Sequence, residues 1–279
     1  MSKLDLGPIG ITVPVSADGG HLADAAALEK LGYSALWLRG GQVDSLDRIA
    51  EVVRATSAVP VVPAIIPLDV YPSGDVLRLH ADLEERAPGR FVAGLGGPQV
   101  ARPLRPLNEY LDRLDQGDPP LPASRRILAA LGPRKLEIAR DRAAGAVLLL
   151  VTPAYVRTSR GILGQHSTLV VSQMAVLETD VGRAREIARG PLRFLSKVPG
   201  YRASFARMGF TSADVDGLSD ELVDRLVAWG DGDAIAARVS EHVRAGADHV
   251  AVTMLDDGRF APVDAARELA RNTRMTSKS

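Results

Sequence analysis

The chain has 279 residues, with 34 Lys plus Arg and 34 Asp plus Glu, so its formal net charge is zero. This balance argues against a general nucleic-acid or membrane-surface binder. It contains no cysteine, which excludes disulfides, zinc–thiolate sites and cysteine nucleophiles. A hydrophobic fraction of 46% is typical of a globular protein with a large core.

The ends and apolar runs of the chain bear on its location. No stretch reaches the roughly 18 uninterrupted apolar residues of a membrane span. The first apolar run is too short for a signal peptide, and no small-residue cleavage site follows it. We therefore expect a cytoplasmic protein that binds neither membrane nor nucleic acid.

Short apolar runs rich in β-branched residues recur along the chain and predict strands. Most are continuous rather than alternating, as expected for parallel strands covered on both faces. The predicted strands, numbered one to eight, span residues 9–15, 35–38, 59–66, 90–96, 126–131, 146–151, 168–177 and 249–255.

Helical patterns separate these runs, and several have recognisable ends. The helix that begins at Pro133 is predicted to end at Gly145, since proline favours the first helical position and glycine the position after the last. A later helix has Asp233 near its N-cap and Gly246 at its end. Each of these helices leads directly into a predicted strand.

Strands that alternate with helices predict an α/β protein with a parallel sheet, and eight repeats favour closure into a (β/α)₈ TIM barrel. An open, doubly wound sheet is the alternative. Residues 180–230 show helical periodicity without a strand, and we interpret them as a helical insertion between strand seven and helix seven. No linker divides the chain, so residues 1–279 are predicted to form a single domain.

Several segments, taken in order, resemble the luciferase-like monooxygenase superfamily and, within it, an actinobacterial group of coenzyme F420-dependent oxidoreductases. The most specific are ERAPGRFVAGLG at 85–96, LVDRLVAWGDGDAIAARV at 222–239 and AGADHVAVTML at 245–255. With weaker segments between them, they cover almost the whole chain. The resemblance implies a luciferase-like barrel that transfers a hydride between a reduced deazaflavin and a small organic substrate, and that pairs into a homodimer.

In such barrels the active site lies at the carboxyl ends of the strands, and the resemblance implies cofactor contacts after predicted strands three to six. Gly94, Gly96 and Gly97 end strand four. A glycine there lets the backbone approach a flat ring or a phosphate. A tight turn is the alternative interpretation of the same residues.

The passage from strand five into the next helix is a second candidate, because free amides at a helix N-terminus attract anions. The resemblance places the ring or phosphate tail of the cofactor along this turn. The alternative is that Arg134 and Lys135 are a solvated surface pair. The candidate contacts are Ala130, Leu131, Gly132, Pro133 and Arg134.

Strand three supplies Val62, Pro63 and Ala64 as further candidates. The resemblance implies a bulge with a cis peptide bond here, which we place at Val62–Pro63; an ordinary trans proline at a bulge is the alternative. Thr152 ends strand six and is a candidate hydrogen-bond donor to the cofactor. An N-cap that precedes Pro153 explains this threonine equally well.

No catalytic residue is assigned from the sequence. Better-known relatives carry an acid and a histidine after strand two, where this chain has Arg39, Gly40 and Gly41. His21 follows strand one at the appropriate end of the barrel, although a helix cap explains it equally well. No pair of histidines has metal-ligand spacing, so no metal is expected.

These departures leave two further hypotheses open. One is an FMN-dependent luciferase-like monooxygenase, which keeps the fold and changes the cofactor. The other is a non-catalytic barrel with a degenerate site that serves as a binding protein, motivated by the missing acid–histidine pair and by a short, proline-rich loop after strand four.

Overall fold

The computed structural model describes residues 3–16, 18–39, 44–97, 102–255 and 262–272. Gly40 and Gly41, and residues 98–101 of the proline-rich loop, lie outside these ranges.

The strands follow one another along the chain in the predicted order, but the third is divided into β3 and β4, and β9 is added. They are β1 (Ile9–Val13), β2 (Leu36–Arg39), β3 (Val61–Ala64), β4 (Ile66–Pro67), β5 (Ala93–Gly96), β6 (Arg126–Ala129), β7 (Gly145–Leu149), β8 (Thr168–Leu177), β9 (Ala228–Gly230) and β10 (His249–Leu255).

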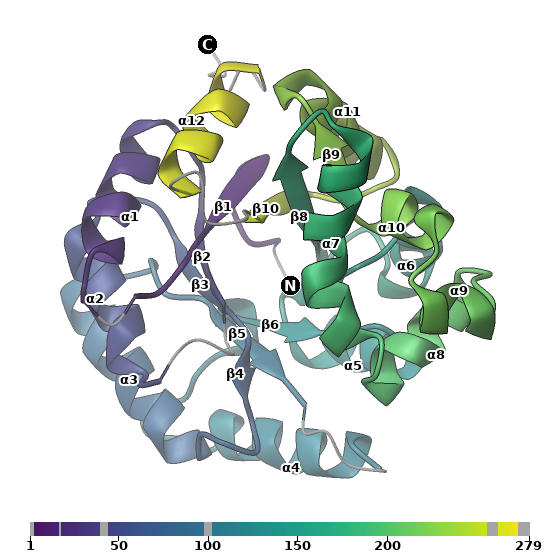
Figure 1. Cartoon of the computed structure of the whole chain (residues 1–279). Coiled ribbons are helices and arrows are strands. Elements are labelled where there is room, and N and C mark those ends of the chain that lie inside the picture. Colours follow the sequence, from purple (N-terminus) through teal and green to yellow (C-terminus); the bar gives the residue numbers. More distant parts are fainter. Residues whose placement is uncertain (1–2, 17, 40–43, 98–101, 256–261, 273–279) are drawn as a thin grey trace.

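All strand pairs are parallel, and the strands form one ring (Figure 1). Their order is β3-β2-β1-β10-β8-β7-β6-β5-β4, and β9 pairs with the end of β8. The ring closes where Val61 pairs with Phe91, just before β5. The predicted TIM barrel is thereby confirmed.

Helices surround this ring on the outside (Figure 1). They are α1 (His21–Lys30), α2 (Asp47–Ala55), α3 (Ser73–Arg86), α4 (Leu104–Asp115), α5 (Pro133–Arg142), α6 (Pro153–Leu163), α7 (Val181–Leu195), α8 (Pro199–Arg207), α9 (Ser212–Gly217), α10 (Asp220–Leu226), α11 (Gly232–Arg244) and α12 (Pro262–Asn272).

Some element boundaries differ from the prediction. Residues 180–230 contain α7 to α10 but also end in the strand β9. Gly145 begins β7 and does not cap α5; a Cβ on it would lie 1.8 Å from the Thr168 carbonyl oxygen, so this glycine allows β7 and β8 to approach. The N-cap of α11 is Asp231, whose side chain accepts a hydrogen bond from the Ala234 N–H, and Asp233 lies near it in the first turn, as predicted.

The predicted cis bond at Val62–Pro63 is wrong. The structure has cis peptide bonds at Ala64–Ile65 and at Asp118–Pro119. Val62 and Pro63 both lie in the ladder that β3 forms with β2, so their backbone keeps regular strand geometry. The departure from that geometry follows Ala64, in the break between β3 and β4, which the prediction had joined into one strand.

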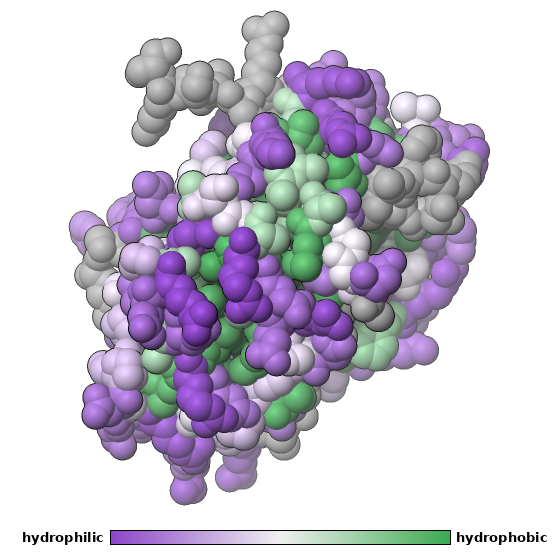
Figure 2. Space-filling model, turned by 90° about the vertical axis from the view of Figure 1, so that its left-hand side faces the viewer, coloured by the Kyte–Doolittle hydropathy of each residue, from purple (hydrophilic) through white to green (hydrophobic). Residues whose placement is uncertain are grey.

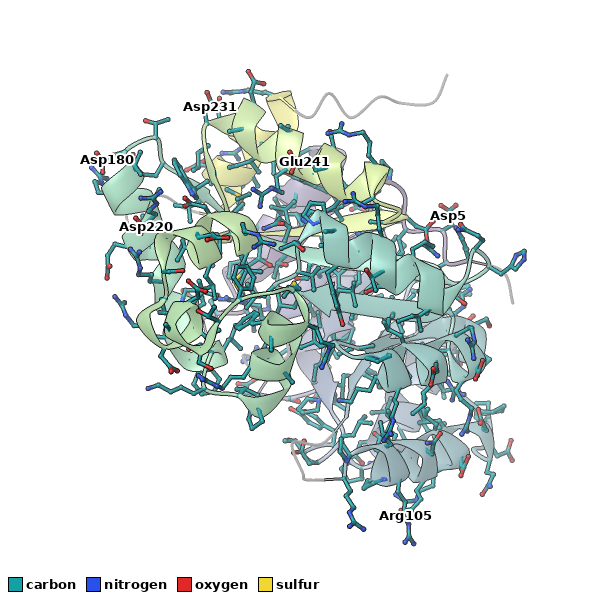
Figure 3. All side chains as sticks on the ribbon, turned by 90° about the vertical axis from the view of Figure 1, so that its right-hand side faces the viewer. Asp5, Arg105, Asp180, Asp220, Asp231 and Glu241 are labelled. Atoms are coloured by element: carbon teal, nitrogen blue, oxygen red, sulfur yellow. The ribbon has the colours of Figure 1, made fainter. Side chains whose placement is uncertain are left out.

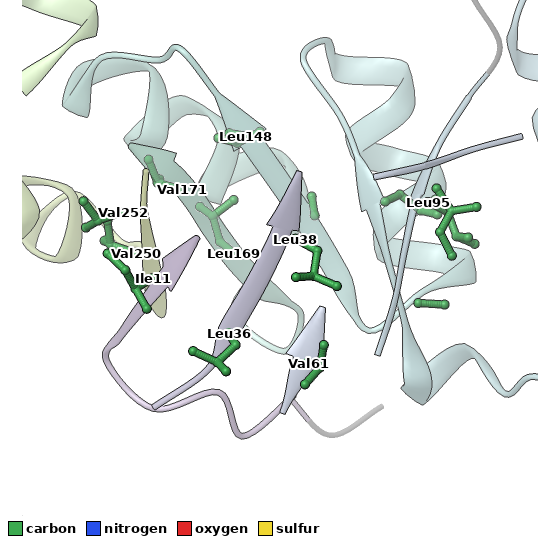
Figure 4. Packing of buried hydrophobic residues seen from close by; sticks show 14 of the residues in the cluster. Ile11, Leu36, Leu38, Val61, Leu95, Leu148, Leu169, Val171, Val250 and Val252 are labelled. Atoms are coloured by element: carbon green, nitrogen blue, oxygen red, sulfur yellow. The ribbon is translucent and has the colours of Figure 1, made fainter. Parts of the chain in front are cut away.

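The core has two layers separated by the barrel wall. Residues on the outer faces of the strands, such as Leu36, Leu38 and Val250, pack against the helices (Figure 4). Residues on the inner faces, such as Trp37, Val62 and Ala251, fill the barrel. The barrel is therefore a packed core, as is usual for this fold.

The segment before β1 closes the amino-terminal end of the barrel. Leu4 and Leu6 join the inner cluster, and the Leu4 N–H donates to the Thr168 hydroxyl at 2.8 Å. Just above them, the Trp37 indole N–H donates to His249 Nε2 at 3.0 Å. A Cβ on Gly10 would lie 2.6 Å from that nitrogen, so the glycine makes room for the pair.

Helices α7 to α10 form a separate apolar cluster at the other end of the barrel. Figure 3 shows Asp180 and Asp220, from this part of the chain, on the opposite side of the molecule from Asp5. The apolar side chains of α7 to α10 pack against the inner-face residues Leu149, Met174 and Leu255. These helices therefore cover part of the carboxyl-terminal mouth.

On the side of the barrel that carries α1, α2 and α3, hydrophilic residues cover most of the surface (Figure 2). In the described part of the chain, no helix is long and apolar enough to cross a membrane.

Candidate functional site

The strand register decides which side chains face the inside of the barrel at its carboxyl-terminal mouth. On β2, Leu36 and Leu38 face the helices and Trp37 faces inward. Successive side chains point to opposite faces of a strand, so Arg39 lies on the inner face, one layer above Trp37. Its register partner Ala64 packs with the inner cluster.

Two threonines in register with Trp37, and a serine deeper in the barrel, also lie on the inner face below Arg39. Thr12 pairs in register with Trp37 and therefore faces inward, and its hydroxyl lies 2.8 Å from that of Thr253 on β10. Ser172 on β8 follows the inward-facing Val170 by two residues. The inner face on β1 and β10 thus carries a hydroxyl pair, whereas Met174 and Leu255 make the ends of β8 and β10 apolar.

Arg39 has no ion pair and no side-chain hydrogen bond with any residue that the structure describes. Its side chain is partly buried, and this desolvation lowers the pKa of the guanidinium below its usual value. Arginine stays charged in proteins even so. The barrel mouth therefore contains a cation without a counter-ion from the described chain.

The predicted glycine contacts at the end of β5 are filled by the protein's own atoms. A Cβ on Gly94 would lie 1.9 Å from the Pro63 carbonyl oxygen, and one on Gly96 would lie 2.1 Å from Ile65 Cδ1. These glycines therefore let β5 lie close to the bend between β3 and β4. Val62 and Ala64 belong to the inner cluster at the same corner.

The predicted turn after β6 is brought together with a distant arginine. The Tyr155 hydroxyl and Arg207 Nη2 both donate to the Leu131 carbonyl, at 2.8 and 3.0 Å. Arg207 Nη2 also lies within 2.9 Å of where a Cβ on Gly132 would be. Arg207 is exposed and comes from α8, so a free face of its guanidinium stands beside the N-terminus of α5.

The other candidate residues around this turn differ in how far they are exposed to solvent. Ala130 is fully buried against the helices, Pro133 is the first residue of α5, and Arg134 is exposed. Lys135 is partly buried, with its ammonium 3.4 Å from where a Cβ on Gly97 would be. Desolvation lowers the pKa of this lysine.

Thr152 acts as a helix cap, as the alternative interpretation held. Its hydroxyl accepts from the Tyr155 N–H at 3.3 Å, and Pro153 is the first residue of α6. Leu150, just before it, has a left-handed φ of 56°, which turns the chain from β7 into this cap. The Thr152 N–H meets the Met208 sulfur at 3.4 Å, so α8 closes over this cap.

His21 is the first residue of α1 and is buried. Its Nδ1 lies 3.4 Å from the Ser16 hydroxyl, and its Nε2 has no partner in the described structure. In the described ranges no group of three or more His, Cys, Asp or Glu residues is arranged to hold a metal ion.

The candidate site therefore has two parts. One is the turn of Leu131 and Gly132 with Tyr155 and Arg207; the other is Arg39 with the hydroxyl pair of Thr12 and Thr253 below it. The sequence analysis missed the role of Arg207, which is 76 residues from Leu131, and it treated Arg39 only as a missing acid.

The fold defines a (β/α)₈ barrel of the kind used by deazaflavin- and flavin-dependent enzymes, as comparison with solved structures shows. An F420-dependent secondary alcohol dehydrogenase in complex with an F420–acetone adduct superposes with a TM-score of 0.73 and 13% identity, covering 98% of this chain and 100% of that one. The F420-dependent tetrahydromethanopterin reductase from Methanopyrus kandleri gives 0.74 and 13%, covering 96% and 99%.

A monooxygenase has the same fold. The oxygenating constituent of 3,6-diketocamphane monooxygenase from Pseudomonas putida, in complex with FMN, gives a TM-score of 0.65 and 13% identity, covering 96% of this chain and 98% of that one. No protein-family model and no curated protein matches the sequence. At these identities the likeness establishes the fold.

Proposed function

We propose that this protein is an F420-dependent oxidoreductase that transfers a hydride between the reduced deazaflavin and a small organic substrate. The observation that carries the proposal is the pairing of Arg207 with the N-terminus of α5 at the mouth of this barrel. Both features attract an anion. Coenzyme F420, like FMN, has a phosphate group in its tail.

The residues at this turn fit such a phosphate. Gly132 is the N-cap of α5 and has no Cβ to block approach, and the nearby Arg207 guanidinium is exposed. Tyr155 fixes the Leu131 carbonyl, which in turn orients Arg207. We assign phosphate binding to Gly132 and Arg207, with the other residues of the turn and the β3–β5 corner around the rest of the cofactor.

The cofactor supplies the carbon that carries the hydride, and the protein supplies binding, orientation and electrostatics. The apolar residues of the corner, Val62, Ala64 and Ile65, exclude water from one side of the mouth. Helices α7 to α10 cover another side through their contacts with Leu149 and Leu255. Such a site needs few titratable groups, and Arg39 is the one cation that the described strands place on the inner face.

The test is a spectroscopic titration of the purified protein with F420 and, in parallel, with FMN. We expect F420 to bind in the micromolar range and FMN more weakly. Preferential FMN binding would favour the monooxygenase alternative. Binding of neither cofactor at high micromolar concentration would refute the proposal and favour a non-catalytic barrel, to which the filling of the Gly94 and Gly96 corner by Pro63 and Ile65 also points.

A matched pair of variants tests the assigned phosphate site. Arg207→Gln should weaken F420 binding by about 10-fold, the usual effect of losing one charge-assisted hydrogen bond. Arg202→Gln removes the same charge from the same helix, at a residue that pairs with Asp216, and should leave binding within about twofold. Equal effects of the two variants would show that only the net charge of α8 matters.

A further inference from the structure

Arg39 stands apart from the other arginines that are buried in this protein. Arg90 donates to the Val53 and Thr56 carbonyls, both at 2.9 Å. Arg126 donates to the Arg142 carbonyl at 2.8 Å and to Asp115 at 2.6 Å. Arg160 donates to the Gly246 carbonyl and to Asp248.

Those arginines have a structural role, because each joins segments that are distant in the sequence. No such partner among the described residues accounts for Arg39. A desolvated cation costs stability unless something compensates for it. The partly buried guanidinium of Arg39, which has no partner among the described residues, is therefore available to an anionic ligand that enters the barrel mouth.

The position of Arg39 indicates which ligand this is. The residues that we assign to the cofactor lie on β3, β5, β6 and β7 and on the turns that follow them. Arg39 lies on β2, in the half of the mouth formed by β1 and β2, one layer above Thr12 and its partner Thr253. This half is left for the substrate once the cofactor occupies the other.

The chemistry of the group narrows the substrate class. A guanidinium presents its N–H donors in a planar fork that matches the two oxygens of a carboxylate. The hydroxyls of Thr12 and Thr253 contact each other and have remaining capacity for an uncharged oxygen of the same molecule. A small carboxylic acid satisfies the cation and the hydroxyl pair together.

We propose that the substrate of this enzyme carries a carboxylate, which Arg39 binds in the barrel mouth. The inference rests on the proposed function, because it assigns to the substrate the half of the mouth that the cofactor leaves free. It makes Arg39 the residue that determines substrate class, at the position where the resemblance led us to look for an acid.

The experiment compares carboxylates with their neutral amides as probes. Acetate and benzoate, and acetamide and benzamide, are titrated into the full-length protein, and binding is followed by ligand-observed NMR. The wild-type protein should bind at least one carboxylate about 10-fold or more tightly than its amide. Arg39→Gln should remove that preference by weakening carboxylate binding about 10- to 100-fold, with little change for the amide.

Two further variants complete the test. Arg39→Lys keeps the charge without the fork and should retain part of the preference. Arg54→Gln removes an exposed charge from α2 and should leave every affinity within about twofold. A wild-type protein without carboxylate preference, or an Arg39→Gln variant that retains it, would overturn the proposal.

Titration of the same variants with F420 separates this inference from the proposed function. Arg39→Gln should bind F420 within about twofold of the wild type. If it lost F420 in proportion to the carboxylates, Arg39 would belong to the cofactor site and the inference would fail. If the wild type bound carboxylates but not F420, the proposed cofactor would be wrong and the anion site would stand.

Discussion

At the scale of single residues, the clearest feature is that a few side chains are placed at a cost to stability. Arg39 is desolvated and has no partner among the described residues. Replacing Arg39 by an apolar side chain removes a partly buried charge that forms no ion pair with the described residues. Functional sites often carry such a cost.

We therefore expect Arg39→Leu to stabilise the ligand-free protein by about 1–2 kcal/mol, which raises its melting temperature by several degrees. Differential scanning calorimetry measures the change. Arg54→Leu removes an exposed charge and should give no gain. A melting temperature lowered by Arg39→Leu would mean that the guanidinium supports the fold.

Two buried histidines, His242 and His249, form hydrogen bonds with strands of the barrel in their neutral form. His249 donates from Nδ1 to the Gly7 carbonyl at 2.8 Å and accepts at Nε2 from the Trp37 indole. His242 donates from Nε2 to Gln173 Oε1 at 2.6 Å, because the amide nitrogen of Gln173 already donates to two carbonyls. Its Nδ1 is buried without a partner in the described structure.

Protonation would therefore place a charge and an unsatisfied N–H inside the protein. Burial lowers the pKa of each histidine from 6.5 to about 4. The unfolded chain thus binds more protons than the folded one between these values, and stability is lost as the pH falls through this window. The loss approaches something on the order of 3 kcal/mol for each group.

Denaturant titrations at pH 7, 6, 5 and 4 should show this decline. In the His242→Gln variant, the unfolding free energy should fall between pH 7 and pH 4 by about half as much as it falls in the wild type. His166→Gln, at an exposed position, should follow the wild type. A wild-type stability that is constant from pH 7 to pH 4 would contradict the assignment of neutral histidines.

At the scale of elements, two glycines illustrate opposite constraints. Gly145 opens β7, where a Cβ would lie 1.8 Å from the Thr168 carbonyl oxygen of β8. Gly161 lies in α6, where a Cβ would meet nothing within 4 Å. The first glycine permits strand pairing, whereas the second only adds backbone freedom to a helix.

Gly145→Ala should destabilise the protein by about 3 kcal/mol or more, since backbone atoms of two strands would have to move apart. Gly161→Ala should stabilise it by about 0.5–1 kcal/mol. Urea denaturation of both variants gives the comparison. If Gly145→Ala were tolerated as well as Gly161→Ala, the close approach of β7 and β8 would be wrong.

The elements themselves follow largely from sequence, and the exceptions have local causes. Apolar runs rich in β-branched residues predicted β8 and β10 with their exact bounds, because such residues favour strands over helices. β9 was missed, since Ala228–Gly230 is too short to show a period and follows a helical pattern. Gly145 was assigned to a helix end because the spacing of Pro and Gly cannot distinguish a cap from a strand contact.

At the scale of the whole molecule, the two ends of the barrel differ. The amino-terminal end is closed by Leu4 and Leu6. Helices α7 to α10 cover the other end with a cluster of their own, of which α9 and α10 are short. A ligand that enters the mouth must pass beside these helices.

We expect α7 to α10 to open more readily than the barrel, because their cluster is smaller and joins the barrel mainly at the ends of β7, β8 and β10. Hydrogen exchange followed by mass spectrometry should show faster exchange in residues 181–226 than in residues 126–149. Asp224→Asn should increase the difference, since Asp224 joins Arg185 of α7 to the Trp229 indole of β9. Equal protection of both regions would show a single cooperative unit.

By itself, the sequence determined the alternation of strands and helices, and with it a parallel sheet and the end at which a site must lie; closure into a barrel was shown by the structure. These follow from local periodicity and from helix-end residues, which act over a few positions. Only the tertiary structure decided which residues meet: Arg207 with the turn after β6, Ile65 with Gly96, and Arg39 with the inside of the barrel. Leu36, Trp37 and Leu38 are all apolar, so the sequence pattern of β2 does not predict which of its faces points into the barrel. That choice is made by the register of β2 between β1 and β3, and register is a property of neighbouring strands.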